Sequence, residues 1–357
     1  MSNLADMGDS FLRSFAKLVI EIFALFFLFI RPTDSNTRFF TLWMIWDIFS
    51  TILFPESLSG ISGIVYTWFP QAAFLVGYFC NESNPDTKKY VKIAVVPLLL
   101  IAIYFILNNP LNFMMQDGEK GVDNMIFYIV CLVPFIMLID KDIYKGALLV
   151  ICVVMAINSL KRNAMIMTAL CLMIFIFSVL KEQKRVLYRN MIIIAVLFIL
   201  GFRYIIENMS LSIEQGLLRF EAIQDDGGSG RDFLWRDCIN ALSRNDIVDW
   251  IIGHGYAGTM KVAKHTSAHN DLLTILIEQG LIGAVFYLVF IFRLIRDAWR
   301  LIKNKSYGIT SMLCMCVIVI FMGLFSNLVP LATYFSYITL AYGIIMSENK
   351  CIAHQQR

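Results

Sequence analysis

Long apolar runs recur along almost the whole chain, and they constrain the fold more than any other feature of the sequence. A helix that spans a bilayer needs roughly 20 mostly apolar residues, and eleven runs reach or approach that length. They lie at about 14–30, 39–54, 61–80, 91–107, 122–139, 143–159, 163–180, 190–206, 271–292, 309–327 and 331–346. Only 16% of the residues are charged, whereas about a quarter are charged in a soluble domain. We therefore expect an all-α, polytopic integral membrane protein with about 11 transmembrane helices, within a range of about 10 to 12.

One long polar segment, from Glu207 to Asn270, interrupts the apolar runs. The sequence has no fixed repeat, no Ser/Pro-rich linker and no low-complexity tract. The simplest organisation is therefore a single integral membrane domain over residues 1–357, with residues 207–270 as a long loop within it. Arg13 and Lys17 stand before the apolar stretch of the first run, as basic residues do in a secretory signal peptide. No small-residue cleavage site follows the stretch, so we expect an anchor helix and not a removed signal.

The distribution of basic residues predicts which side of the membrane the long loop occupies. One set of loops carries 18 Lys and Arg, whereas the short segments of the other set carry 5, and 7 more lie in and beside the long loop. Short cytoplasmic loops are enriched in Lys and Arg, so the long loop faces outward together with Lys161 and Arg162. Arg13 and Lys17 fit an outer position poorly, which leaves the orientation of the first run open. No long basic run suggests a nucleic-acid partner.

Three of the four histidines gather in the second half of the long loop, at His254, His265 and His269. The plain alternative is a set of solvated surface histidines. The spacing of His265 and His269 resembles that of a zinc-binding helix, but the intervening residues include no glutamate. We therefore expect no metal site here.

An amphipathic stretch lies earlier in the long loop, after the glycines at 227–230, which we expect to end a turn. Its apolar residues are Phe233, Leu234, Ile239 and Leu242. Its residues suited to the membrane interface are Arg231, Trp235 and Arg236. Two interpretations of these arginines stay open: side chains that snorkel from an ordinary interfacial helix, or ligands of a phosphate group.

Two ionisable residues stand at or within the apolar runs themselves. Arg162 lies at the outer junction of two runs, where such groups are often functional, although an interfacial anchor explains it equally well. Asp47 lies deep within the second run. It either pairs with a basic residue or lines a cavity, and the sequence does not choose between these roles.

In chain order, these motifs form a signature. They are Gly230-Arg231 with Trp235, then Gly253-His254-Gly255, then His269-Asn270, and finally Glu278-Gln279-Gly280-Leu281-Ile282-Gly283. This order resembles the O-antigen ligase and polymerase superfamily. The junction Ser159-Leu160-Lys161-Arg162 is similar to that family's Ser-Arg junction, but two residues separate the serine from the arginine here. That departure leaves the role of Arg162 open.

The resemblance implies glycosyl transfer from a polyprenyl-diphosphate-linked oligosaccharide, at the periplasmic face of a bacterial inner membrane. Arg231 and Arg162 are then expected to bind the diphosphate, because a guanidinium holds phosphate oxygens through directed, charge-assisted bonds. His269 is the expected general base. Further candidates for binding or orienting the substrate are Asn270, Trp235, Arg236, His254 and His265. No cofactor or metal is expected, and the expected partners are membrane lipids, the lipid-linked glycans and a chain-length regulator protein.

Three functions remain open at this stage. The modest size of the chain and of its loop favours a polymerase that joins lipid-linked repeat units. The first alternative is a ligase that transfers the glycan to lipid A core. A transporter of lipids or solutes would also explain the helices and Asp47, but it would not use the histidines.

Overall fold

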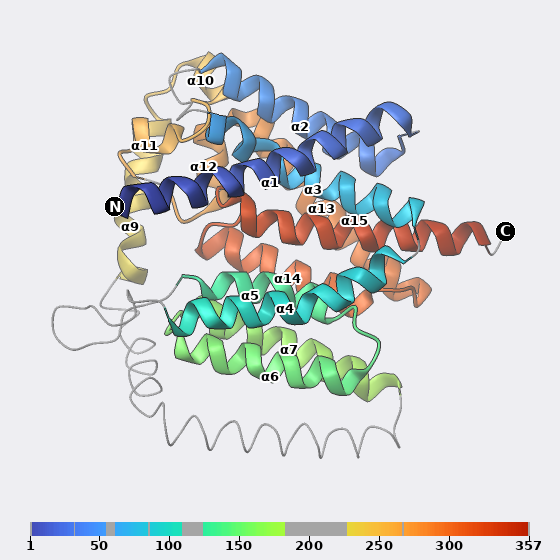
Figure 1. The fold of residues 1–357 in the computed structure, drawn as a ribbon. Helices are drawn as coiled ribbons and strands as arrows, with labels where there is room; N and C mark the ends of the chain where they lie inside the picture. Colours follow the sequence, from blue (N-terminus) through green and yellow to red (C-terminus); the bar gives the residue numbers. More distant parts are fainter. Residues whose placement is uncertain are drawn as a thin grey trace. The chain divides into compact units, whose positions relative to one another are not determined.

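The structure, a computed structural model, describes most of the chain. The described ranges are 2–31, 33–54, 61–84, 86–108, 124–182, 227–265 and 268–355. Within them every regular element is a helix and there is no strand (Figure 1), which confirms the all-α expectation. The expected run at 190–206 and the first part of the long loop lie outside the described residues.

The chain divides into two compact units. The first comprises Met1–Thr87, Arg231–Leu294 and Met322–Arg357, and the second comprises Lys88–Gly230 and Ile295–Phe321. Helices of the first unit are α1 (Ser2–Ile30), α2 (Ser35–Leu53), α3 (Ile61–Ser83), α10 (Ile247–Ile252), α11 (Gly258–Val262), α12 (Asp271–Glu278) and α15 (Ala332–Gln355), with most of α9 (Gly227–Leu242). Those of the second are α4 (Thr87–Leu107), α5 (Ile126–Ile136), α6 (Asp142–Asn158) and α7 (Arg162–Glu182). Helices α13 (Gly280–Asn304) and α14 (Ile309–Phe325) contribute residues to both units.

An aromatic core holds the first unit together, with α3 packed against α1, α2 and α15. The rings of Phe40 and Phe74 are stacked at 3.8 Å, and Trp43, Phe290 and Tyr342 surround them. Each of these five side chains is at most 2% exposed. Because aromatic pairs combine a large buried area with a preferred geometry, this cluster fixes how α2 and α3 pack against each other.

Helix α1 is polar on the inside and apolar on the outside. Its Lys17 and Glu21 are buried, whereas Phe23, Phe26 and Phe29 are more than half exposed. A helix in water buries the opposite face. This inverted pattern is what a bilayer favours, because lipid solvates the phenylalanines and the protein interior shields the ionisable groups.

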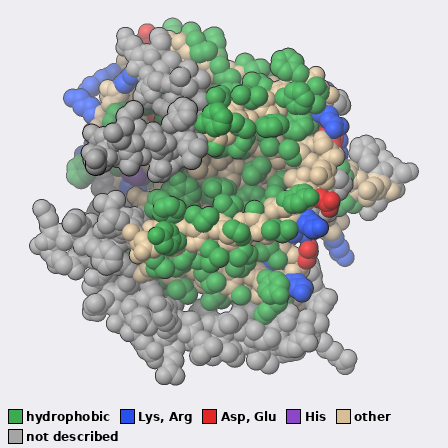
Figure 2. All heavy atoms as spheres, in the orientation of Figure 1, with side chains coloured by type: hydrophobic (Ala, Val, Ile, Leu, Met, Phe, Trp, Pro, Cys, Tyr) green, Lys and Arg blue, Asp and Glu red, His purple; other side chains and the backbone are tan. Residues whose placement is uncertain are grey.

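Helix α5 forms the centre of the second unit, and α6 and α7 pack against it. All of its residues except Tyr128 are buried. Helix α4 is the contrasting case, because Ile93, Leu100 and Tyr104 are each at least 60% exposed. Figure 2 shows hydrophobic side chains covering this helix. Such an exposed apolar surface suits contact with lipid.

Two helices in the described residues are long and apolar enough to cross a membrane by length and composition, Lys89–Leu107 and Arg162–Leu180. Two shorter apolar helices are Ile126–Ile136 and Ile309–Phe325. These helices agree with an all-α membrane protein. The number of about 11 transmembrane helices stays a prediction.

The structure differs from the sequence prediction at two places. The expected run at 271–292 is two helices, because α12 ends at Glu278 and α13 begins at Gly280. The glycines at 227–230 do not end a turn but form the first turn of α9. In both cases local composition was misleading. A glycine can lie inside a helix, and an apolar run can contain a break wherever another segment packs against the chain.

Candidate functional site

The predicted catalytic residue, His269, lies at the entry to α12. Its backbone has a φ of 49°, a left-handed conformation that few residues other than glycine adopt. Asn270 is the N-cap of α12, and its side chain accepts a hydrogen bond from the Leu273 N–H at 3.1 Å. Asn270 therefore holds the start of α12, and His269 is the residue directly outside it. Backbone strain of this kind often accompanies a functional side chain.

Asp271, the next residue, is fully buried and holds a second segment against the same helix start. Its carboxylate accepts hydrogen bonds from the backbone N–H groups of Leu328 at 2.9 Å and Val329 at 3.2 Å, and from the Tyr287 hydroxyl at 3.2 Å. Residues 326–331 join α14 to α15. Sequence reasoning missed Asp271, although an acidic residue at the start of an apolar run is a recognisable signal.

This connection between α14 and α15 brings Asn327 to His269. The side-chain amide of Asn327 lies 3.2 Å from Nδ1 of His269. Its Oδ1 atom is buried and has no hydrogen-bond partner in the described part of the chain. An amide at one ring nitrogen sets which nitrogen carries the proton. No signal in the sequence indicated Asn327, because it is 58 residues away along the chain.

Helix α9 docks beside the same entry through Trp235, whose indole N–H donates a 3.0 Å hydrogen bond to the carbonyl of Ala268. Around it, Cys238 and Leu242 are buried in a cluster that includes Ala268 and Ile277. Burial, together with the charge of Asp237, raises the pKa of Cys238 to about 11. These contacts define the face of α9 that packs against α12.

Arg231 lies one helical turn before Trp235 in α9. Residues four apart project from the same side of a helix. Arg231 therefore lies on the side of α9 by which Trp235 contacts Ala268, and it is partly buried there. Arg236 is exposed, with its guanidinium 5.9 Å from the ring of Phe233. The two arginines that the sequence left equivalent thus have different environments.

The structure does not bring the three histidines of the long loop together. Nε2 of His265 lies 2.9 Å from a carboxylate oxygen of Asp237 in α9. Nε2 of His254 lies 3.0 Å from Oδ1 of Asn245, and the His254 N–H donates to Ile277 at the far end of α12 from His269. Each has its own local partner. In the described residues, no three His, Cys, Asp or Glu side chains are grouped as metal ligands.

Two glycines of the sequence signature, Gly253 and Gly280, pack directly against each other's backbone. Both have positive φ, 82° and 66°. A Cβ on Gly253 would lie 2.6 Å from the carbonyl oxygen of Glu278, closer than any side chain tolerates. The Gly255 N–H also donates to that carbonyl at 2.8 Å. The two glycines therefore form one structural feature, a backbone contact that ends α12 and starts α13.

Arg162 begins α7, in the second unit, directly after the tight junction with α6. Leu160 adopts a φ of 55° in this junction and is 1% exposed. The Ser159 hydroxyl donates to Ala156 at 2.7 Å and accepts from the Lys161 N–H at 3.2 Å. The hairpin predicted from the sequence is present, and Arg162 is partly buried.

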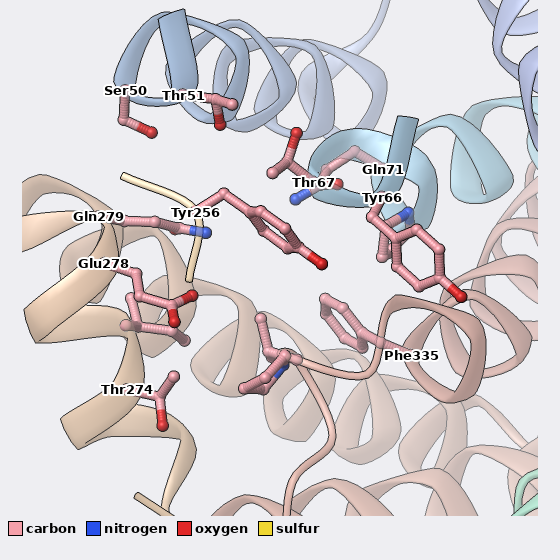
Figure 3. A pocket seen from close by; sticks show the side chains of 14 residues that line it. Ser50, Thr51, Tyr66, Thr67, Gln71, Tyr256, Thr274, Glu278, Gln279 and Phe335 are labelled. Atoms are coloured by element: carbon pink, nitrogen blue, oxygen red, sulfur yellow. The ribbon is translucent and has the colours of Figure 1, made fainter. Parts of the chain in front are cut away.

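A polar pocket lies beside α12 (Figure 3). It is lined by Ser50, Thr51, Tyr66, Thr67, Pro70, Gln71, Tyr256, Thr274, Ile275, Glu278, Gln279, Val329, Pro330 and Phe335. Behind it, Gln71 donates a 2.6 Å hydrogen bond to Asp47. The described partner of the Asp47 carboxylate is therefore an amide and not a basic residue.

Comparison with protein families identifies one matching region. Residues 147–288 match the family model described as O-antigen ligase. The match includes Arg162, Arg231 and His269, and it confirms the resemblance to the O-antigen ligase and polymerase superfamily. No curated protein sequence matches the chain.

Proposed function

Because residues 147–288 match the O-antigen ligase family model and support the resemblance to the O-antigen ligase and polymerase superfamily, we propose that the protein polymerises polyprenyl-diphosphate-linked oligosaccharide repeat units at the periplasmic face of a bacterial inner membrane. The family supports a membrane enzyme of surface polysaccharide synthesis that acts on lipid-linked glycans. The observation that carries the proposed chemistry is the environment of His269. A strained backbone, a helix cap and an amide from a distant segment all hold this one side chain.

In the proposed reaction, a hydroxyl oxygen of the acceptor sugar attacks the anomeric carbon of the donor. The bond from that carbon to the diphosphate breaks, and the polyprenyl diphosphate leaves with the bonding electrons. His269 takes the proton of the attacking hydroxyl, a contribution of roughly 100- to 10,000-fold in rate. Direct displacement of this kind inverts the configuration at the anomeric carbon.

Arg231 and Arg162 would bind the leaving diphosphate in this mechanism. The developing negative charge favours guanidinium groups, which stay protonated and bond two phosphate oxygens at once. The docking of α9 on Ala268 supports this role for Arg231, because it places a turn of the helix that carries Arg231 next to His269. The role of Arg162 rests on the resemblance alone.

Asn327 is proposed to position His269 as a base. The base must carry its lone pair on Nε2, so Nδ1 must keep its proton and donate it. The amide oxygen of Asn327 would accept that proton once the amide is rotated by about 180°, which exchanges its two ends without moving the rest of the side chain. Asn327 would then act through His269 and would not touch the substrate.

A ligase is the second candidate, and the matched family model is described as O-antigen ligase. The match supports both functions equally. Both reactions use the same donor and leaving group, and they differ in the acceptor. A polymerase transfers to another lipid-linked repeat unit, whereas a ligase transfers to lipid A core. The same side chains would serve either reaction.

Deletion of the gene and complementation separates these functions on a lipopolysaccharide gel. Loss of a polymerase leaves lipopolysaccharide capped by one repeat unit, whereas loss of a ligase leaves none capped. Complementation with His269→Ala or Arg231→Ala should reproduce the deletion, and His265→Ala should restore the wild-type pattern. Full activity of His269→Ala, or loss of activity of the purified wild-type enzyme on chelation, would contradict the mechanism.

A further inference from the structure

The pocket against α12 has no place in the transfer chemistry, and its composition points to a ligand. All of its lining residues belong to the first unit. Those from α2 and α3 lie outside residues 147–288, so the family match does not assign them. The lining is rich in hydroxyl and amide groups, which is unusual for a buried site in a chain of this composition.

Two lining amides have unused hydrogen-bonding capacity. Gln71 is 1% exposed, and its Oε1 atom has no hydrogen-bond partner within the described part of the chain, although its amide N–H bonds Asp47. The Oε1 atom of Gln279 is likewise buried without such a partner. Leaving a buried polar atom unpaired costs about 1–3 kcal/mol. The Oε1 atom of Gln279 lies beside Gly283 of α13, so Oε1 of Gln71 is the acceptor suited to a ligand's hydroxyl or N–H group.

Donors complement this acceptor. Burial, reinforced by the negative charge of Glu278, raises the pKa of Tyr256 above its ordinary value, so its hydroxyl keeps its proton. Figure 3 shows the Tyr256 ring extending across the pocket, with its hydroxyl directed toward the side of Tyr66. The Thr51 hydroxyl donates to the carbonyl of Asp47 at 2.7 Å, and its oxygen can still accept a hydrogen bond.

The charge of the lining excludes the diphosphate as occupant. The lining residues include one carboxyl group, Glu278, and no Lys, Arg or His. Lys17, whose ammonium lies 3.1 Å from the centre of the Tyr66 ring, is not itself a lining residue. An anion would find no opposite charge here. A polyhydroxyl ligand without charge finds both donors and acceptors.

We propose that this pocket is a binding subsite for an uncharged sugar residue of the lipid-linked glycan, and that Thr51, Gln71 and Tyr256 recognise its hydroxyl groups. The proposal rests on the proposed function, because that function supplies the glycan. Helix α12 links the two sites. The helix begins directly after His269 and Asn270, and Thr274, Ile275 and Glu278 of the helix line the pocket. At 1.5 Å per residue, the separation from His269 to Thr274 is roughly 8 Å along the helix, which a short oligosaccharide can bridge.

The test measures binding without turnover. The probe is the repeat-unit oligosaccharide released from the host's own lipid-linked pool by mild acid, which removes the diphosphate and the lipid. The full-length protein in nanodiscs is titrated with this probe and, separately, with sugar-free undecaprenyl diphosphate. Saturation-transfer NMR identifies the sugar residue in contact with the protein.

Thr51→Val and Thr41→Val form a matched pair for this test. Both threonines lie in α2, and each hydroxyl donates to the backbone carbonyl four residues earlier, at 2.7 and 2.8 Å. Only Thr51 lines the pocket. We expect Thr51→Val and Tyr256→Phe each to weaken oligosaccharide binding roughly 3- to 10-fold, the contribution of one neutral hydrogen bond. Thr41→Val should bind as the wild type does, and Gln71→Met should show the largest loss if it folds.

Binding of undecaprenyl diphosphate should not change in Thr51→Val. The pocket proposal is wrong if Thr51→Val and Tyr256→Phe both bind the oligosaccharide like the wild type, or if they weaken the diphosphate lipid instead. Failure of the proposed function has a different signature. In that case the oligosaccharide binds and Thr51→Val weakens its binding, but the wild-type protein forms no polymer from lipid-linked repeat units.

Discussion

Two tight junctions, one before α12 and one between α6 and α7, contain the same left-handed backbone conformation, but residues with different roles adopt it. Leu160 in the α6–α7 junction and His269 before α12 both have positive φ, 55° and 49°. The strained residue of the first junction is a buried leucine, and Arg162 follows it at the start of α7. The strained residue of the second is the proposed base itself. Backbone strain alone therefore does not identify a functional residue. The groups that surround the strained side chain determine whether it has a functional role.

The largest effects on transfer rate and on stability are expected from substitutions of His269 and Leu160, made as two separate variants. His269→Ala is expected to lower glycan transfer by at least about 100-fold, because it removes the base, while the protein stays folded. Leu160→Ala is expected to lower the free energy of unfolding by about 2–5 kcal/mol, as other buried leucines do, while the folded fraction transfers at the normal rate. Thermal unfolding in detergent and single-turnover transfer measure the two quantities. The comparison fails if Leu160→Ala is inactive although folded.

Arg162, which follows the α6–α7 junction, and Arg231, in the helix that docks on Ala268 before α12, provide the next test. Arg231→Ala and Arg162→Ala should each lower transfer roughly 10- to 150-fold, the value of one lost charge-assisted hydrogen bond of about 1.5–3 kcal/mol. Arg231→Lys should recover only part of the rate, because an ammonium cannot bond two oxygens at once. Arg236→Ala is the matched control, since Arg236 lies exposed on the same helix. A wild-type rate for Arg162→Ala would show that its junction is purely structural.

Asn327 gives a smaller effect that reports on positioning. Asn327→Ala should lower transfer roughly 10-fold, as loss of a residue that orients a functional imidazole commonly does. Asn327→Asp keeps an acceptor for the Nδ1 proton and should retain most of the rate. Its pH profile should shift upward, because a carboxylate beside the ring favours the protonated imidazole, which must lose its proton before it acts. If Asn327→Asp is the less active of the two, the amide donates to His269 and the positioning role is wrong.

The smallest effect concerns the docking of α9. The Cys238 thiol, with a pKa raised to about 11 by burial and by Asp237, stays protonated near neutral pH. Labelling by maleimide should be slow at about pH 7 and should accelerate up to about pH 10, as the thiolate fraction rises. Trp235→Phe, which loses the bond to Ala268, should increase labelling roughly 3- to 10-fold by mass spectrometry. Unchanged labelling would show that Trp235 does not hold α9 in place.

Features determined by neighbouring residues could be predicted from the sequence. Apolar runs predicted helices, and every regular element in the described residues is a helix. The apolar run that begins at residue 271 predicted a helix directly after His269-Asn270, and Asn270 is the N-cap of that helix. The order of the motifs indicated a resemblance that the family match over residues 147–288 supports. The inverted polarity of α1, in contrast, needed the structure to show which side was buried.

The tertiary structure alone decided which of the polar residues act together. It separated His254 and His265 from His269, and it supplied Asn327, Asp271 and the pocket beside α12. These contacts join residues far apart in the chain, 58 residues for His269 and Asn327 and 24 for Gln71 and Asp47. Periodicity and capping act over one or two helical turns, so they carry no information about such pairs. Only the packing of whole helices brings these side chains together.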